Sequence, residues 1–255
     1  MSPKKVAELT EKKCRMETGL FIVEGEKNIL ELLTSDFEVV ALLATKPFLS
    51  IARCEILAYE KKYRRFACDE VTESVLKSCG TLMSNNTGIA VARQKKAPAL
   101  AQIMEEAQKN IVVVLDDIRD PGNLGTIIRT ANWYGVTHII ASLTTTDFYN
   151  PKVIAASMGS FTRTAISYLN LEEVFKEAVL QQLPIITAGM KGENTHTAKL
   201  PHFGFLVMGS ESHGISSESA QYATNTVTIP RFGDAESLNV SVATGILLDT
   251  LTRTK

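Results

Sequence analysis

In the second part of the chain, short apolar runs alternate with longer segments of helical spacing. The runs are nearly continuous in Val, Ile and Leu, which is typical of strands with both faces buried. Strands are expected in "IVVVLDD" (111–117), "THIIAS" (137–142), "LPIITAG" (183–189), "FGFLVMG" (203–209) and "VTIP" (227–230). Helices are expected in "PGNLGTIIRTANWYG" (121–135), in "NPKVIAASMGS" (150–160) and from about residue 236. This alternation predicts an α/β fold with a parallel sheet, whose ligands bind beyond the carboxyl ends of the strands.

The first part of the chain predicts a smaller α/β domain. Its apolar runs (21–23, 39–43 and 88–91) alternate with helical patterns (27–33, 50–59 and 72–79). The stretch "ARQKKAPALAQ" (92–102) interrupts the periodicity at Pro98. We therefore predict a first domain over 1–97, a linker over 98–105 and a second domain over 106–255.

Net charge argues against a generic nucleic-acid binder, but its distribution is uneven. The chain of 255 residues has a formal net charge of −1, whereas residues 1–97 hold 16 Lys and Arg against 13 Asp and Glu. Basic clusters in this part stand at 12–15, 61–65 and 95–96, the second with Tyr63 and Phe66 beside it. Such clusters are either a solvated lysine-rich surface or a surface for RNA backbone and base stacking.

Membrane and metal chemistry have little support in the sequence. No apolar run approaches the roughly 18 residues of a membrane span, and the amino-terminal segment is charged and amphipathic. The four cysteines form no Cys-x-x-Cys pair and have no His at ligand spacing. We expect no metal, no membrane partner, and reduced thiols in a cytoplasmic protein.

The first loop with candidate chemistry follows the strand at 111–117. Pro121 and Gly122 turn the chain, Asn123 is a suitable N-cap, and Arg129 lies further along the same helix. Arg129 is either a side chain on the helix surface, for which Asp116 and Asp117 are candidate partners, or part of an anion site at the start of the helix.

The second loop is "GSESHG" (209–214). Gly209 would let a ligand approach the backbone, and Glu211 and Gly214 follow it. Although Ser and His are adjacent here, the segment is not Gly-x-Ser-x-Gly, so a serine hydrolase is disfavoured. No Gly-x-Gly-x-x-Gly follows any strand, which disfavours a dinucleotide site.

The third loop leads into the last helix. Val240, Ala243, Leu247 and Leu251 fall on one helical stripe. The segment that precedes and opens this helix is unusually polar, with Ser237, Asn239 and Ser241 alternating with Leu238 and Val240. One cap needs one such residue, so the segment either packs closely as a capped helix or binds a flat aromatic ligand ringed by hydrogen bonds.

These three segments, in this order, resemble the SpoU (TrmH-like) family of SPOUT-class RNA ribose 2′-O-methyltransferases. The family motif Asn-x-Gly-x-x-x-Arg stands here as Asn123, Gly125 and Arg129, and Gly-x-Glu-x-x-Gly as residues 209–214. The motif Ile-Pro…Glu-Ser-Leu-Asn-Val-Ser-x-Ala stands as 229–230 and 236–243. In the first part, "FIVEG" (21–25) and "NTGIAV" (86–91) are similar to the family's substrate-binding domain. Two segments depart from the family pattern, Arg231 after Pro230 and "SNNT" (84–87), and both bear on the RNA target.

The resemblance implies a carboxyl-terminal trefoil knot that binds S-adenosylmethionine, a homodimer formed through the knotted domain, and an active site shared between two chains. The implied cofactor-binding residues are Gly189, Gly209, Ile229 and Leu238. The implied catalytic residues are Arg129, Asn123, Glu211, Ser237 and Asn239. Because a guanidinium does not readily accept a proton, we expect Arg129 to bind phosphate and polarise the hydroxyl rather than act as the base.

The resemblance implies ribosomal RNA as the substrate, with transfer RNA as the alternative. A non-catalytic RNA-binding or ribosome-assembly protein on the same fold, and a small-molecule α/β enzyme, are the other interpretations.

Overall fold

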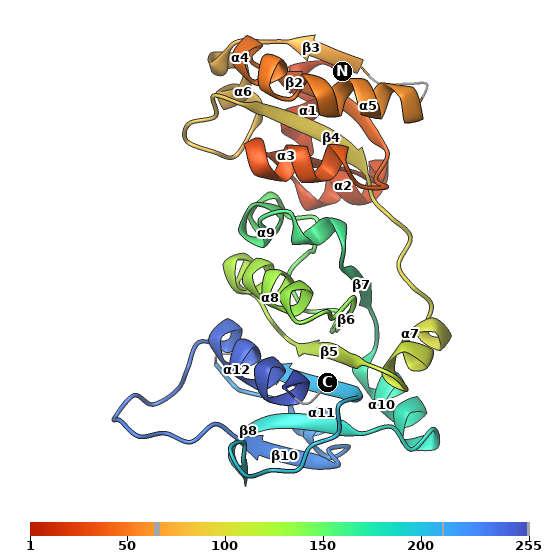
Figure 1. Cartoon of the computed structure of the whole chain (residues 1–255), viewed down its shortest axis with the longest axis vertical. Helices are drawn as coiled ribbons and strands as arrows, with labels where there is room; N and C mark the ends of the chain where they lie inside the picture. The colour runs from red at the N-terminus through yellow and green to blue at the C-terminus, as the bar shows by residue number, and fades with distance from the viewer. Residues whose placement is uncertain (64–66, 211, 254–255) are drawn as a thin grey trace. The chain divides into compact units, whose positions relative to one another are not determined.

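The chain forms two compact units in a computed structural model that describes residues 1–63, 67–210 and 212–253. Unit 1 comprises Met1–Lys96 and Asp147–Thr162, and unit 2 comprises Ala97–Thr146 and Arg163–Lys255 (Figure 1). Each unit has its own sheet and helices, so the predicted α/β class is confirmed. In the part of the chain that the structure describes, no helix is both long and apolar enough to cross a membrane.

The sheet of unit 2 has six strands, one more than the five apolar runs predict, because Ala165–Tyr168 also forms a strand. Every neighbouring pair is parallel, as predicted. Its spatial order is β10-β8-β9-β5-β6-β7. The strands are β5 (Ile111–Asp116), β6 (His138–Ala141), β7 (Ala165–Tyr168), β8 (Ile185–Asn194), β9 (Gly204–Gly209) and β10 (Asn225–Thr228).

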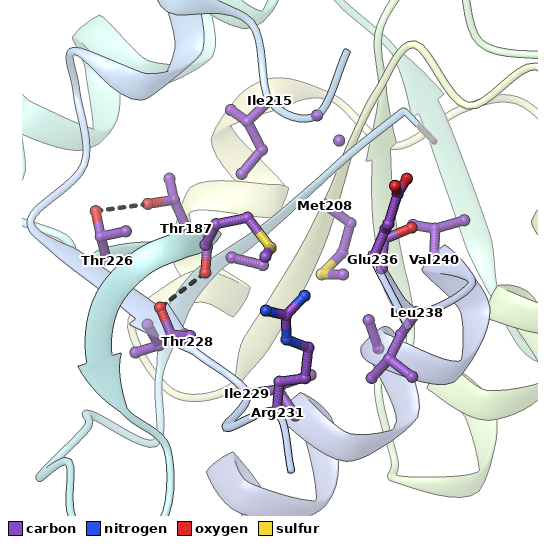
Figure 2. Close-up of a pocket in the computed structure, with 18 of the residues that line it drawn as sticks. Thr187, Met208, Ile215, Thr226, Thr228, Ile229, Arg231, Glu236, Leu238 and Val240 are labelled. Atoms are coloured by element: carbon purple, nitrogen blue, oxygen red, sulfur yellow. Dashed lines mark hydrogen bonds between the residues drawn. The ribbon is translucent and has the colours of Figure 1, made fainter. Parts of the chain in front are cut away.

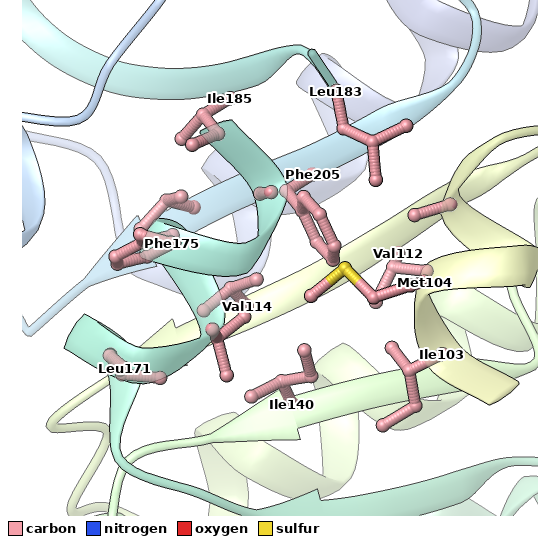
Figure 3. Packing of buried hydrophobic residues seen from close by; sticks show 14 residues of the cluster. Ile103, Met104, Val112, Val114, Ile140, Leu171, Phe175, Leu183, Ile185 and Phe205 are labelled. Carbon is pink, nitrogen blue, oxygen red and sulfur yellow. The ribbon is translucent and has the colours of Figure 1, made fainter. Parts of the chain in front are cut away.

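Helices cover both faces of this sheet. They are α7 (Leu100–Ala107), α8 (Pro121–Trp133), α10 (Leu171–Leu180), α11 (Ser217–Ala220) and α12 (Val240–Thr252). Figure 1 shows α8 and α12 on one side of the sheet and α7 and α10 on the other. The core under α7 and α10 includes Met104, Val114, Phe175 and Phe205, which interdigitate in Figure 3. Burial of apolar surface stabilises a fold by a free energy of about 25 cal/mol per Å², and it is the main force that holds the helices against the sheet.

Unit 1 has a four-stranded mixed sheet of order β1-β4-β2-β3. Strand β4 is antiparallel to β1 and β2, whereas β2 and β3 are parallel. The strands are β1 (Leu20–Glu24), β2 (Val39–Ala44), β3 (Ala67–Glu70) and β4 (Gly88–Arg93). The helices are α1 (Pro3–Glu8), α2 (Lys12–Thr18), α3 (Glu26–Leu33), α4 (Lys46–Ile51), α5 (Arg53–Lys62), α6 (Glu73–Cys79) and α9 (Pro151–Ser157), with the 3₁₀ turn η1 (Ser160–Thr162). The predicted basic cluster at 61–65 lies partly outside the described residues.

Two features differ from the sequence-based division of the chain. Helix α7 occupies most of the predicted linker 98–105, because Ile103, Met104 and Ala107 form an apolar face that is buried against the sheet of unit 2. Residues 147–162, which the sequence assigns to the second domain, belong to unit 1. Local apolar spacing predicts the helix at 151–157 but does not say which core it joins.

A buried arginine holds the segment 147–162 within unit 1. The Arg15 side chain is only 2% exposed, and its Nε and Nη2 donate to Oδ2 of Asp147 at 2.9 and 2.6 Å. Its Nη1 donates to the carbonyl oxygens of Leu9 and Thr10 at 3.0 and 2.8 Å. A buried guanidinium is tolerated when its donors are satisfied and an opposite charge is close.

Replacing Arg15 should destabilise unit 1 strongly. Arg15→Ala leaves the Asp147 carboxylate without its partner, and loss of one member of a buried ion pair costs about 3–5 kcal/mol of unfolding free energy. Urea denaturation followed by circular dichroism measures the loss, and faster amide exchange in 151–162 locates it. The matched control is Arg93→Ala, whose pair with Glu38 is exposed and should contribute about 0–1 kcal/mol. Equal losses in the two variants would contradict this assignment.

Candidate functional site

A pocket of about 750 Å³ opens beside residues 187–190 of β8 and the carboxyl ends of β9 and β10 (Figure 2). Parallel strands end at one edge of the sheet, so segments far apart in sequence meet there. The lining residues lie in 187–190, 208–210, 213–215, 226–233 and 235–238, with Ala220, Val240 and Ala243. The four residues predicted to bind the cofactor, Gly189, Gly209, Ile229 and Leu238, all lie in this lining.

The pocket is apolar inside and more exposed toward its rim. Met208, Val227 and Val240 are buried, while Leu238 is 48% exposed and faces the same space in Figure 2. Apolar walls with a few convergent polar groups are typical of sites for small organic ligands. The arrangement therefore suits a ligand with a flat apolar part.

The loop after β9 folds back tightly on Gly209. The amide of Ser210 donates to the carbonyl of Gly214 at 3.0 Å, and the amide of Gly214 donates back at 2.9 Å. A Cβ on Gly209 would lie 2.1 Å from the carbonyl carbon of Gly214. Gly209 is thus required by the chain's own loop and not only by an approaching ligand. Glu211, predicted to be catalytic, lies outside the described residues.

Asp116, at the end of β5, holds the far end of this loop, a role that the sequence analysis missed. It is buried, and its Oδ2 accepts hydrogen bonds from the amide and the hydroxyl of Ser216 at 3.0 and 2.7 Å. The sequence signal was an acidic residue at the end of an apolar strand. Asp116 therefore positions the wall formed by 213–215 without lining the pocket.

Strand β8 forms the opposite wall and is longer than predicted. It runs to Asn194 instead of ending near Gly189, and its register with β10 shifts between Thr226 and Val227. The Thr187 and Thr226 hydroxyls lie 3.0 Å apart, and the Thr228 hydroxyl donates to the Gly189 carbonyl at 2.8 Å (Figure 2). Polar, exposed residues after Gly189 hide this strand from an apolar-run analysis.

Helix α8 begins two residues before the predicted N-cap. Asp120 is the cap, and its Oδ1 accepts from the amide of Asn123 at 2.8 Å, while Pro121 occupies the first helical position. Proline is favoured there because its φ is already helical and the missing N–H is not needed. The prediction of Asn123 as N-cap is therefore wrong, and its side chain serves another contact.

That contact joins the starts of α8 and α12. Nδ2 of Asn239 donates to Oδ1 of Asn123 at 2.9 Å. Oδ1 of Asn239 accepts from the amide and the hydroxyl of Ser241 at 2.9 and 2.5 Å, which makes Asn239 the N-cap of α12. The helix begins at Val240, not within 236–239 as predicted, and Ser237 precedes it and lines the pocket.

Comparison with known proteins adds to this geometry. Residues 110–249 match the model of the SpoU rRNA Methylase family, and residues 3–90 match the MRM3-like substrate binding domain. The chain belongs to the SpoU rRNA methylase family. The first match covers the sheet, the pocket and both asparagines of the SpoU motifs.

Relatives share this architecture over most of their length. The 23S rRNA (guanosine(2553)-2'-O)-methyltransferase RlmP of Bacillus subtilis is 27% identical over 240 residues, which cover 93% of this chain and 90% of that protein. A TrmH-family structure from Porphyromonas gingivalis has a TM-score of 0.85 and 32% identity, covering 99% of this chain and 97% of that one. An AdoMet-bound rRNA methyltransferase from Sinorhizobium meliloti has a TM-score of 0.83 and 30% identity, covering 99% and 94%.

The SpoU arginine stands apart from the pocket of its own chain. Arg129 is exposed, does not line the pocket and forms no ion pair with any described residue. It does not pair with Asp116, which binds Ser216, or with Asp117, which pairs with Arg119 at 3.0 Å. The Arg119 hydrogen bond lowers the pKa of Asp117 below its ordinary value. Arg129 is therefore a surface side chain of α8, as one of the two interpretations has it, but the pairing with Asp116 or Asp117 is not formed.

Among the predicted catalytic residues, the structure brings Asn123 and Asn239 into contact and places Ser237 in the pocket wall. Their catalytic roles remain predictions. No group of three or more His, Cys, Asp or Glu side chains suited to a metal occurs among the residues that the structure describes.

Substitution of Gly209 should disturb this site and lower stability. Gly209→Ala puts a methyl group into the backbone of Gly214 and Ile215, and overpacking of this kind costs about 1–3 kcal/mol. Gly233→Ala is the matched control, because Gly233 lines the same pocket and a Cβ there would meet nothing within 4 Å. Urea unfolding of both variants measures the difference. A Gly209 variant as stable as the Gly233 variant would show that the loop after β9 adapts freely.

Proposed function

We propose that this chain is an S-adenosylmethionine-dependent methyltransferase that modifies a ribose 2′-hydroxyl in ribosomal RNA. The observation that carries the proposal is the pocket, which is lined by parts of β8, β9 and β10 and by the segment before α12, all within the match to the SpoU family. The names of the relatives support both the cofactor and the RNA class, since one acts on 23S rRNA and another holds AdoMet.

The residues that line the pocket fit this cofactor. Adenine is flat and apolar on its faces, and Leu238 and Ile229 offer apolar side chains beside the accessible backbone of Gly189 and Gly209. These four residues would hold the cofactor, which supplies an electrophilic methyl group when bound. The pocket volume of about 750 Å³ lies in the ordinary range for organic ligands.

The remaining residues act by position and charge. Arg129 would bind a phosphate next to the target ribose and polarise its hydroxyl, because a guanidinium donates hydrogen bonds and keeps its proton. Asn123 and Asn239, already joined by a hydrogen bond, would orient that hydroxyl with Ser237 and Glu211. Holding a nucleophile in line with the methyl group can supply several kcal/mol of the rate enhancement.

We also propose a role for unit 1 and an assembly for the whole protein. Unit 1 would bind the RNA, which its excess of Lys and Arg in 1–97 and its match to a substrate-binding family support. Family membership also supports a trefoil knot around the pocket, homodimerisation through unit 2 and a cytoplasmic location. The four free cysteines agree with a reducing compartment.

One methyl-transfer assay distinguishes three alternatives. The protein methylates ribosomal RNA, methylates transfer RNA, or binds RNA without catalysis. We expect purified protein to transfer the radiolabelled methyl group of S-adenosylmethionine to 23S rRNA transcripts, and nucleoside analysis should place it on a ribose 2′-oxygen. Methyl on a base would refute the reaction, whereas methylation of transfer RNA alone would refute only the substrate. Cofactor retention without transfer to either RNA would favour the non-catalytic alternative.

The exposed position of Arg129 supports an active site shared between two protomers. Arg129→Ala removes the arginine and Leu238→Glu disrupts the pocket, so each variant alone should be inactive. After random subunit exchange about half of the dimers are mixed, and each has one intact site of two. Activity should therefore return to about a quarter of wild type. If exchange is verified by mass spectrometry and the mixture stays inactive, Arg129 acts within its own chain.

A further inference from the structure

The side chain of Arg231 lines the pocket from the segment that follows β10. Figure 2 shows its guanidinium extending toward the middle of the pocket, between Thr228 and Leu238. Its Nη1 donates to the carbonyl of Ala235 at 3.3 Å, and no acidic side chain among the residues that the structure describes forms an ion pair with it. The residue is exposed, so its remaining donors are open to a ligand.

Charge is scarce elsewhere in this pocket. Among the described lining residues, Arg231 and Glu236 are the only ones with a full charge at neutral pH, and both are exposed. The apolar walls lie deeper, at Met208, Val227 and Val240. A matching ligand has an apolar end and a zwitterionic end, because buried charges are costly and charges at a rim keep part of their hydration.

We infer that Arg231 binds the carboxylate of the amino-acid end of S-adenosylmethionine, while Glu236 faces its ammonium group. The inference rests on the proposed function, since it assumes that cofactor. A guanidinium fits a carboxylate because its N–H groups form a planar fork that donates two parallel hydrogen bonds. The adenosyl part then lies against the apolar walls, and the two charges determine which end of the ligand faces the rim.

Calorimetric titration of the full chain with three ligands tests this role. The ligands are S-adenosylmethionine, its decarboxylated analogue, and 5′-methylthioadenosine, which lacks the whole amino-acid end. Arg231→Met should weaken binding of S-adenosylmethionine about tenfold, as expected for one charge-assisted contact near solvent. Binding of the other two ligands should not change, because neither has a carboxylate. The affinity of Arg231→Lys for S-adenosylmethionine should lie between those of wild type and Arg231→Met, because lysine keeps the charge but lacks the planar fork of N–H groups.

The controls separate this inference from simpler explanations. An equal loss for all three ligands would mean that Arg231 only holds the loop through Ala235, and would overturn the inference. Unchanged affinity for S-adenosylmethionine would also overturn it, and weaker RNA binding in the same variant would then assign Arg231 to a phosphate. If wild-type protein binds none of the three ligands, the proposed function itself fails.

Discussion

The parallel ladder of unit 2 is the constraint on which the site depends. Asp116 pairs with Gly209 in the β5–β9 register, and Thr187 pairs with both Val207 and Thr226. Residues nearly a hundred positions apart are thus adjacent at one edge before any side chain contributes. Since all strands point the same way, segments that are far apart in the chain meet along this edge, and the pocket arises from parts of three strands, β8, β9 and β10, instead of one continuous segment.

Asn239 shows how one side chain connects this edge to the helices. Its Oδ1 caps α12, and its Nδ2 donates to Asn123 on α8. Aspartate would keep the cap and lose the donor, whereas serine offers a shorter side chain with a single oxygen. Of these three side chains, only the amide provides an acceptor atom and a separate donor atom on one planar group. In the polar segment at the start of the last helix, Asn239 therefore provides both the cap and the bridge between helices, while Ser237 lines the pocket.

The sequence predicted the parts of the fold that depend on local pattern. Continuous apolar runs predicted five strands of unit 2 and their parallel arrangement. Glycines and short family motifs, each local in the chain, predicted the four pocket residues. The start of α8 was predicted wrongly, because Asp120 and Asn123 are both good caps and only the adjacent Pro121 favours the earlier one. The extension of β8 is polar, so pairing with β10 rather than hydrophobic alternation maintains it.

The assignment of 147–162 to unit 1 depends on contacts that sequence spacing does not encode. Arg15 and Asp147 are 132 positions apart, and neither residue type predicts burial by itself. Aromatic packing of Phe21 with Phe161 and Tyr149, at centroid distances of 6.1 and 4.5 Å, reinforces the same connection. Such contacts form only in the folded chain, so local sequence patterns do not predict them.

The chemistry of the proposed reaction explains why an arginine can be important without being a base. As the ribose oxygen attacks the methyl group, its proton becomes strongly acidic, so even a weak acceptor or water can remove it late in the step. The larger demand is alignment of the oxygen with the methyl group and the sulfur. The guanidinium of Arg129 is exposed and pairs with no acidic side chain among the described residues, so its donors are open to solvent. A guanidinium that keeps its proton can therefore contribute through hydrogen bonds and charge alone, without taking the proton from the ribose.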